Sequence, residues 1–194
     1  AESKYEEKSL FTIEPIGGYL SSGFTEIKTP GTPKRREGYV VGANVLYGRG
    51  NWQLETGLQY AERGMLVNNL GSYNYEYTVK YLEVPAMLRW SFVNRQSWSL
   101  FSEAGLVLAT VQDAKLQATG PYSESADVKD NFNSLDTRMA LSFGGTWKYT
   151  KNIAAVMMVN YQSSISPMNK GNNWNGQDAY NDGYAVTVGG QFGI

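Results

Sequence analysis

The side chains best suited to chemistry in this chain are carboxylates and cations at alternate positions of strand-like segments. Paired carboxylates can serve as acid and base in glycoside hydrolysis, and a hairpin would bring Glu83 and Glu103 together. Mixed charges enclosed in one space can instead pair with each other, or pass ions or protons. The predicted set of enclosed charges is Glu14, Glu55, Glu83, Arg89, Glu103, Asp136, Arg138 and Lys148.

The absence of two residue types excludes much other chemistry. The chain has no histidine and no cysteine. Ser-His-Asp hydrolysis and most catalytic zinc sites need an imidazole, and disulfides and thiolate metal sites need a thiol. The carboxylates of residues 112–134, and Asp178 with Asp182, do not match the spacing of an EF-hand loop. We therefore predict no catalytic site, no metal site and no cofactor.

The enclosed charges belong to segments in which polar and apolar residues alternate. Two long strands are predicted between residues 77 and 108, joined by a polar turn at residues 94–97. On the first of them Leu82, Val84 and Leu88 share one face, and Glu83, Met87 and Arg89 share the other. Strand side chains change sides at each residue, so each strand has an apolar face and a mixed face. Further strands are predicted over residues 10–25, 38–47, 52–65, 135–149, 153–161 and 183–194.

The connections between these strands alternate in length. Long polar segments cover residues 26–37, 68–75, 112–134 and 163–182, and short turns cover 48–51, 94–97 and 150–152. Long external loops and short periplasmic turns are typical of outer-membrane barrels. No apolar run reaches the roughly 18–20 residues of a transmembrane helix. The predicted fold is an all-β, eight-stranded, antiparallel up-and-down transmembrane β-barrel over residues 10–194. Pro15 with Gly17 and Gly18 predicts a bend or a bulge in the first strand.

Two features concern the ends of the chain and its charge. Residues 1–9 are charged and predict a loose leader, and the chain carries no basic-then-apolar signal region. An exported protein with this beginning is a mature chain after removal of its signal. The net charge of −1 gives no overall attraction for nucleic acid.

Aromatic residues gather near the predicted strand ends on the apolar faces. Amphipathic rings favour the two water–lipid boundaries of a membrane, so two belts are expected. The belt at the long-loop end is predicted to contain Tyr39, Tyr60, Tyr77, Tyr161 and Tyr184, whereas Trp174 falls in a long loop. The belt at the short-turn end is predicted to contain Tyr47, Trp52, Trp90, Trp98, Trp147, Tyr149 and Phe192.

The segment YLEVP at residues 81–85 resembles the YLEIP motif of PorT-like outer-membrane β-barrel proteins. The glycine-rich first strand and the hairpin plan resemble the same group and, more broadly, OmpX- and OmpA-type barrels. Many such barrels end on an aromatic residue, whereas here Phe192 stands two residues before Ile194. The resemblance implies an outer-membrane location and a signal-bearing precursor. It implies no single shared activity, and some members belong to larger secretion or envelope assemblies.

The lumen of an eight-stranded barrel is narrow enough to be filled by its own side chains. A structural network of paired charges is therefore expected there, with a gated ion or proton path as the alternative. An acid–base pair in such a lumen would lack access for substrate. In the first long segment, basic groups can hold lipopolysaccharide phosphates or simply be solvated. They are Lys28, Lys34, Arg35 and Arg36.

These observations predict a non-enzymatic barrel of a bacterial outer membrane with a structural or interaction role, either by itself or as a subunit of a larger complex. The expected partners are the bilayer, lipopolysaccharide and other outer-membrane proteins. Two alternatives stay open. One is a narrow channel for ions or small apolar solutes. The other is a soluble barrel whose apolar faces line a ligand cavity.

Overall fold

The computed structural model describes residues 10–25, 31–170 and 177–194 of the chain. The predicted leader over residues 1–9, Lys28 and Trp174 lie outside these ranges. Within them the chain is almost all strand, with a 3-10 helix η1 at Lys129–Asn131. No helix among the described residues is long and apolar enough to cross a membrane. The strands are β1 (Phe11–Thr25), β2 (Thr32–Tyr47), β3 (Trp52–Leu70), β4 (Tyr73–Asn94), β5 (Trp98–Thr119), β6 (Glu124–Asp127), β7 (Leu135–Lys148), β8 (Ile153–Ser164) and β9 (Tyr180–Gly193).

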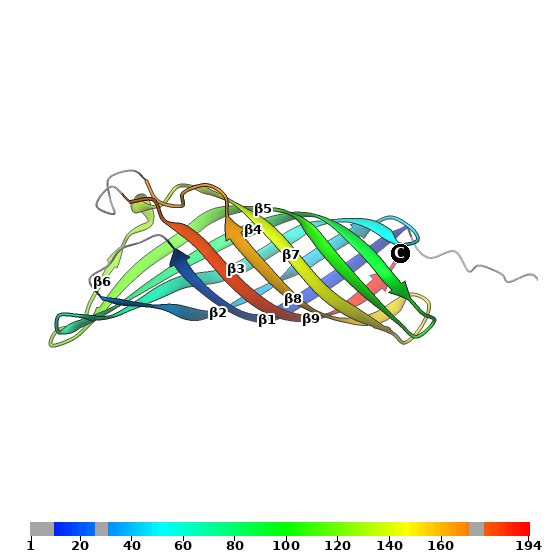
Figure 1. Cartoon of the computed structure of the whole chain (residues 1–194), viewed down its shortest axis with the longest axis horizontal. Coiled ribbons are helices and arrows are strands. Elements are labelled where there is room, and N and C mark those ends of the chain that lie inside the picture. The colour runs from blue at the N-terminus through cyan, green and yellow to red at the C-terminus, as the bar shows by residue number, and fades with distance from the viewer. Residues whose placement is uncertain (1–9, 26–30, 171–176) are drawn as a thin grey trace, which may run out of the picture.

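The strands close into a single barrel (Figure 1). Their order is β4-β3-β2-β1-β9-β8-β7-β5, and β5 also pairs with β4, which completes the cylinder. Every pairing is antiparallel, and the short β6 adds to the end of β5 without entering the cylinder. The predicted eight-stranded barrel is confirmed. Closure leaves no sheet edge within the barrel wall, as a β structure in lipid requires.

Alternation along each strand sorts side chains between lumen and exterior. On β4, Glu83 and Arg89 are buried in the lumen, whereas Val84 and Leu88 are exposed on the outside. The apolar faces therefore point outward. This polarity is opposite to that of the soluble alternative, in which the apolar faces would line a cavity.

The turns follow from the local sequence, whereas the bulge predicted in the first strand does not form. Gly48 and Gly50, with φ of 140° and 77°, form the β2–β3 turn, and Gly71 with φ of 66° forms the β3–β4 turn. Positive φ is strained for other residues, so glycine is suited to these sites. The bulge expected around Pro15 is absent, because β1 pairs with β2 in unbroken register from Phe11 to Ser22.

Three predicted long loops are in large part strand. β2 begins at Thr32, β3 and β4 are separated by residues 71 and 72 alone, and β5 continues to Thr119. These extensions were missed because their outward residues are polar, so the apolar face that marked the strands ends earlier. On β5 an extra residue at Gln112 also shifts the register against β4 and changes which positions face outward.

The strand extensions form a sheet beyond the membrane-facing band. Outward residues of β3 are Trp52, Leu54, Leu58 and Tyr60 over a span close to the roughly 9–11 residues of one crossing. The next outward position is Glu62, which pairs in register with Lys80 of β4. We call the extension the outer sheet: residues 32–36 of β2, 62–70 of β3, 73–81 of β4, 112–119 of β5, and β6. In Figure 1 the end bearing β6 is opposite the C-terminus.

Candidate functional site: the lumen and its outer end

A cluster of charges fills the lumen toward the short-turn end, and we call it the inner cluster. Arg89 of β4 lies at its centre. Its Nη1 is 2.9 Å from an oxygen of Glu14, its Nη2 is 2.7 Å from one of Glu55, and its Nε donates to Glu103. All four side chains are almost completely buried. The guanidinium also stacks over the ring of Phe101, with 4.2 Å to the ring centroid.

Neutral side chains complete the inner cluster from two further strands. Asn44 of β2 donates to Glu55 at 2.9 Å, and Gln191 of β9 donates to Glu14 at 2.7 Å. Three carboxylates thus share a single guanidinium within this group. Buried ions are stable only when they are paired and hydrogen-bonded, and each charge of the inner cluster meets both conditions.

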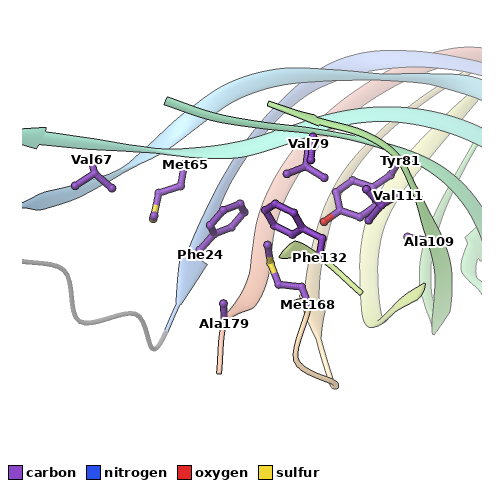
Figure 2. Close-up of a cluster of buried hydrophobic side chains, with 11 residues drawn as sticks. Phe24, Met65, Val67, Val79, Tyr81, Ala109, Val111, Phe132, Met168 and Ala179 are labelled. Carbon is purple, nitrogen blue, oxygen red and sulfur yellow. The ribbon is translucent and has the colours of Figure 1, made fainter. Parts of the chain in front are cut away.

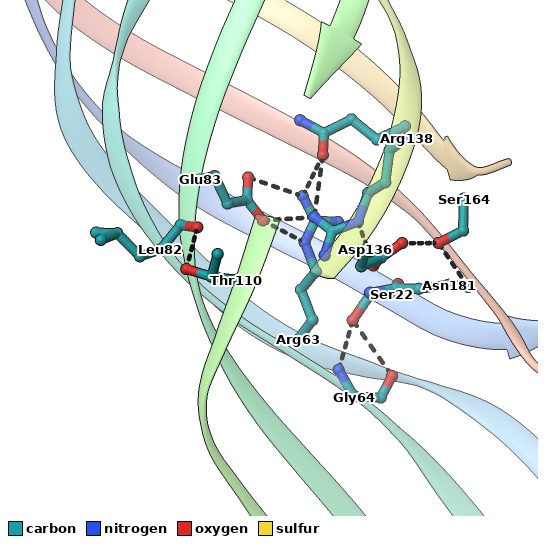
Figure 3. Close-up of polar contacts among 11 residues, drawn as sticks. Ser22, Arg63, Gly64, Leu82, Glu83, Thr110, Asp136, Arg138, Ser164 and Asn181 are labelled. Atoms are coloured by element: carbon teal, nitrogen blue, oxygen red, sulfur yellow. Dashed lines mark hydrogen bonds and ion pairs between the residues drawn. The ribbon is translucent and has the colours of Figure 1, made fainter. Parts of the chain in front are cut away.

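A second group of charges, the outer cluster, lies nearer the long-loop end (Figure 3). Glu83 of β4 accepts hydrogen bonds from Arg63 Nε at 2.9 Å and from Arg138 Nη1 at 2.5 Å. Arg138 also donates to Asp136 at 2.8 Å through its Nε. The Arg138 guanidinium stacks over the ring of Tyr81 at 4.3 Å from the centroid. Two cations and two carboxylates therefore form a balanced buried group.

The structure does not bring all eight predicted charges into the lumen clusters. Seven lie in the two clusters, whereas Lys148 lies at the short-turn mouth, where its Nζ donates to the side chain of Asn94 and the carbonyl of Arg95. Glu83 and Glu103 fall in different clusters, so the hairpin does not form the acid–base pair considered above. Arg63 was missed by the sequence prediction. It stands on the same face of β3 as Glu55 and Gln59, and this alternation was the available signal.

The outer end of the lumen is closed by apolar side chains from the loops (Figure 2). Phe132, after η1, and Met168, between β8 and β9, are buried against Phe24, Met65 and Tyr81. We call this group the apolar plug. The two loop segments are held together by a bridge between Phe132 and Asn169 and by Asn133, whose side chain donates to the carbonyls of residues 167 and 169.

The described side chains leave little free space along the barrel axis. A cavity of about 30 Å³ lies between the two clusters, bordered by Glu55, Arg63 and Thr187. This is room for one or two water molecules. A second cavity of about 100 Å³ opens at the short-turn mouth beside Gln53 and Lys148. The lumen is therefore occupied by paired charges in its middle and by the apolar plug at its outer end.

Of the four cations predicted to contact lipopolysaccharide, Lys34, Arg35 and Arg36 lie on β2 rather than in a loop, and Lys28 lies outside the described residues. Arg35 pairs with Asp182, whereas Arg36 is 2.8 Å from Glu62 and 2.6 Å from Glu76. Burial lowers the pKa of Arg36, but the hydrogen bonds and attraction from the two glutamates outweigh it and raise the pKa overall. Lys34 is exposed. Two of these cations are therefore already engaged within the barrel wall.

Aromatic side chains mark both ends of the lipid-facing band. At the short-turn end the seven predicted rings are all exposed on the exterior, and Trp52 stacks on Trp90 with centroids 5.8 Å apart. At the other end Tyr161 packs against Tyr184, with their ring centroids 4.9 Å apart. The prediction for Tyr77 was wrong, because it packs against the apolar plug inside the barrel. Its strand carries lumen-facing residues at odd positions, so Tyr77 cannot face lipid.

This geometry, a closed barrel with an apolar exterior between aromatic rings, defines an outer-membrane β-barrel. The sequence matches the outer membrane protein beta-barrel domain family over residues 9–170, and the chain belongs to that family. Its location is the bacterial outer membrane. No curated protein matches the chain by sequence.

Solved structures repeat the fold at low sequence identity. Neisserial surface protein A is 11% identical with a TM-score of 0.56, covering 97% of this chain and 100% of its own. The outer membrane protease OmpT of Escherichia coli is 10% identical with a TM-score of 0.52, covering 99% of each chain. Ail, the attachment invasion locus protein of Yersinia pestis, is 17% identical with a TM-score of 0.45, covering 93% and 98%. Such likeness concerns the fold alone.

Proposed function

We propose that this protein is a non-enzymatic interaction barrel of the outer membrane that uses its outer sheet to bind another envelope protein. The observation that carries the proposal is a contrast between inside and outside. The lumen is filled by two ion-paired clusters and the apolar plug, whereas β3, β4 and β5 extend well past the lipid-facing band. An occluded barrel acts through its surface, and here the surface beyond the membrane is an extended sheet.

The outward face of the outer sheet suits a polar partner surface. It carries Glu62, Glu76, Lys80, Asp113 and Lys115, each of which lies beside a group of opposite charge within the sheet. Charges of both signs at a rim favour specific orientation and fast association more than tight binding. The PorT-like motif at residues 81–85 supports a place within a larger assembly, as in some members of that group.

Two other functions are disfavoured, and a third is compatible with this proposal. Hydrolysis, as in the protease OmpT, is disfavoured because the chain lacks histidine and its buried carboxylates contact arginines. Transport of ions or small apolar solutes is disfavoured by the filled lumen. Contact with lipopolysaccharide through the exposed Lys34 is compatible with an interaction barrel, since this residue lies at the edge of the outer sheet.

The test uses a photo-crosslinking residue in place of Gln117, which faces outward on the outer sheet. A matched control replaces Gln96, exposed in the β4–β5 turn at the opposite end. We expect the Gln117 variant to give a discrete protein adduct in intact cells and the Gln96 variant to lack that adduct. In planar bilayers the purified barrel should show no single-channel steps. Well-defined steps together with no adduct at Gln117 would establish the channel alternative instead.

A further inference from the structure

A hollow of about 570 Å³ lies on the outside of the barrel, across β1 to β5. Its floor consists of small side chains on three strands, Thr56, Ala86 and Ala104, and larger ones such as Leu54 and Leu88 border it. The register explains the gap. Thr56 stands directly opposite Ala86, so two small outward residues adjoin on β3 and β4, and Ala104 of β5 stands opposite Leu88, two residues along β4 from Ala86. We call this feature the lipid-facing hollow.

The lipid-facing hollow lies in the half of the membrane nearest the short turns. Along β3 and β4 it is followed by Trp52 and Trp90, which stack on each other at the boundary. Indole rings favour the interface between acyl chains and headgroups. A hollow just inside this boundary is therefore at the depth of the first part of a phospholipid acyl chain.

The short turns beside the lipid-facing hollow carry positive charge. Residues 48–51 and 94–97 contain Arg49 and Arg95 and no carboxylate. Arg49 and Arg95 are exposed. The backbone N–H of Ser91 donates to the carbonyl of Asn51 at 2.8 Å, which holds the β2–β3 turn beside the end of β4. Both arginines therefore belong to turns that adjoin the strands forming the hollow.

We infer that the lipid-facing hollow and these two turns form a binding site for an anionic phospholipid of the periplasmic leaflet. One acyl chain occupies the hollow over Thr56, Ala86 and Ala104, and the headgroup phosphate lies toward Arg49 and Arg95. Apolar contacts hold the acyl chain in the hollow. Attraction to the two arginines favours anionic over zwitterionic headgroups.

Native mass spectrometry of the folded barrel in detergent tests the inference. Equal amounts of phosphatidylglycerol or phosphatidylethanolamine are added, and lipid retained per barrel is counted. We expect preferential retention of phosphatidylglycerol, reduced about five-fold for each of Arg49→Gln and Arg95→Gln. The pair Ala86→Leu and Ala104→Leu, which fills the hollow, should lower retention of both lipids.

Matched controls separate this site from general effects. Ala155→Leu makes one such substitution on the exterior of β8, outside the hollow, and Lys115→Gln removes a cation from the outer sheet. Both controls should retain lipid as the unaltered barrel does. Heat-modifiable gel migration confirms that each variant is folded. Equal retention of the two lipids, or full retention by the filled variant, overturns the inference. A lipid-free dimer lost on filling the hollow overturns it too, and identifies a second copy as the occupant.

Discussion

Arg89 shows most directly how single residues hold this barrel together. Its guanidinium contacts three carboxylates that arrive from β1, β3 and β5, so one side chain joins four strands across the lumen. Arg63 and Arg138 act similarly in the outer cluster through their shared contact with Glu83. These contacts connect strands that are far apart in sequence and lock their relative positions.

Replacing Arg89 by methionine should be severely destabilising. The change leaves Glu14, Glu55 and Glu103 buried around an apolar side chain, and breaking a buried ion pair costs about 3–5 kcal/mol. Urea unfolding of the barrel in lipid vesicles, followed by tryptophan fluorescence, measures the change in the free energy of unfolding. Lys115→Met, at an exposed position of β5, is the control and should change it by less than about 1 kcal/mol. Equal effects of the two variants would show that the inner cluster adds no stability.

The two clusters should respond differently to loss of one carboxylate. Glu55→Gln removes one of three negative charges around Arg89, and the two that remain still contact the guanidinium. Its free energy of unfolding should stay within about 1 kcal/mol of the unaltered barrel. Glu83→Gln removes the group that contacts both Arg63 and Arg138, and should cost about 3–5 kcal/mol. The same urea titration compares them, and the reverse order would contradict this reading of the charge balance.

Among the strands, the β3–β4 hairpin divides most clearly into a lipid-facing part and a part beyond the lipid. Its part below Glu62 faces lipid, and its part above belongs to the outer sheet and the apolar plug. Membrane insertion depends on the lower part, because most of the outward apolar residues lie there. The upper part is thus free to serve binding.

Shortening this hairpin should separate folding from binding. Residues 66–76 can be replaced by Asn-Gly, since Met65 and Tyr77 pair in register and this dipeptide forms a two-residue turn. We expect the shortened barrel to keep heat-modifiable migration, with lower stability because the plug loses Val67 and Tyr75. The protein adduct at Gln117 should disappear. An undiminished adduct would place the partner surface elsewhere on the barrel.

At the scale of the whole molecule, the barrel is blocked at several levels along its axis. The apolar plug closes the outer end, and the two clusters occupy the middle around a gap that holds one or two waters. Each barrier uses a different kind of interaction, so loss of one does not remove the others.

Opening the plug alone should leave the barrel closed to ions. The double variant Phe132→Ala and Met168→Ala removes two large buried side chains and should cost several kcal/mol of stability, about 2–5 for each residue. Planar bilayer recordings should remain without channel steps, because both clusters still fill the lumen. Adding Arg89→Ala to this variant tests the next barrier. Channel steps in the double variant itself would show that the plug is the sole barrier.

The sequence by itself determined the transmembrane barrel of this protein. Alternation at residues such as Glu83, Val84 and Arg89 fixes which face each side chain occupies, because a strand repeats every two residues regardless of what surrounds it. The short turns, such as the one at Gly48 and Gly50, predict the direction of the barrel in the membrane. These signals are local, and they suffice for strand count and polarity.

Only the tertiary structure decided which charges meet and where the strands end. Arg63 and Glu83 come together because β3 and β4 pair with a particular register, and that register is a property of the whole sheet. The sequence predicts loops where the outer sheet lies, because most outward residues there are polar. Hydrogen bonds to neighbouring strands sustain the sheet nevertheless. The plug likewise joins Phe132 to Phe24 across more than half the chain, and closure of the cylinder alone brings them within contact.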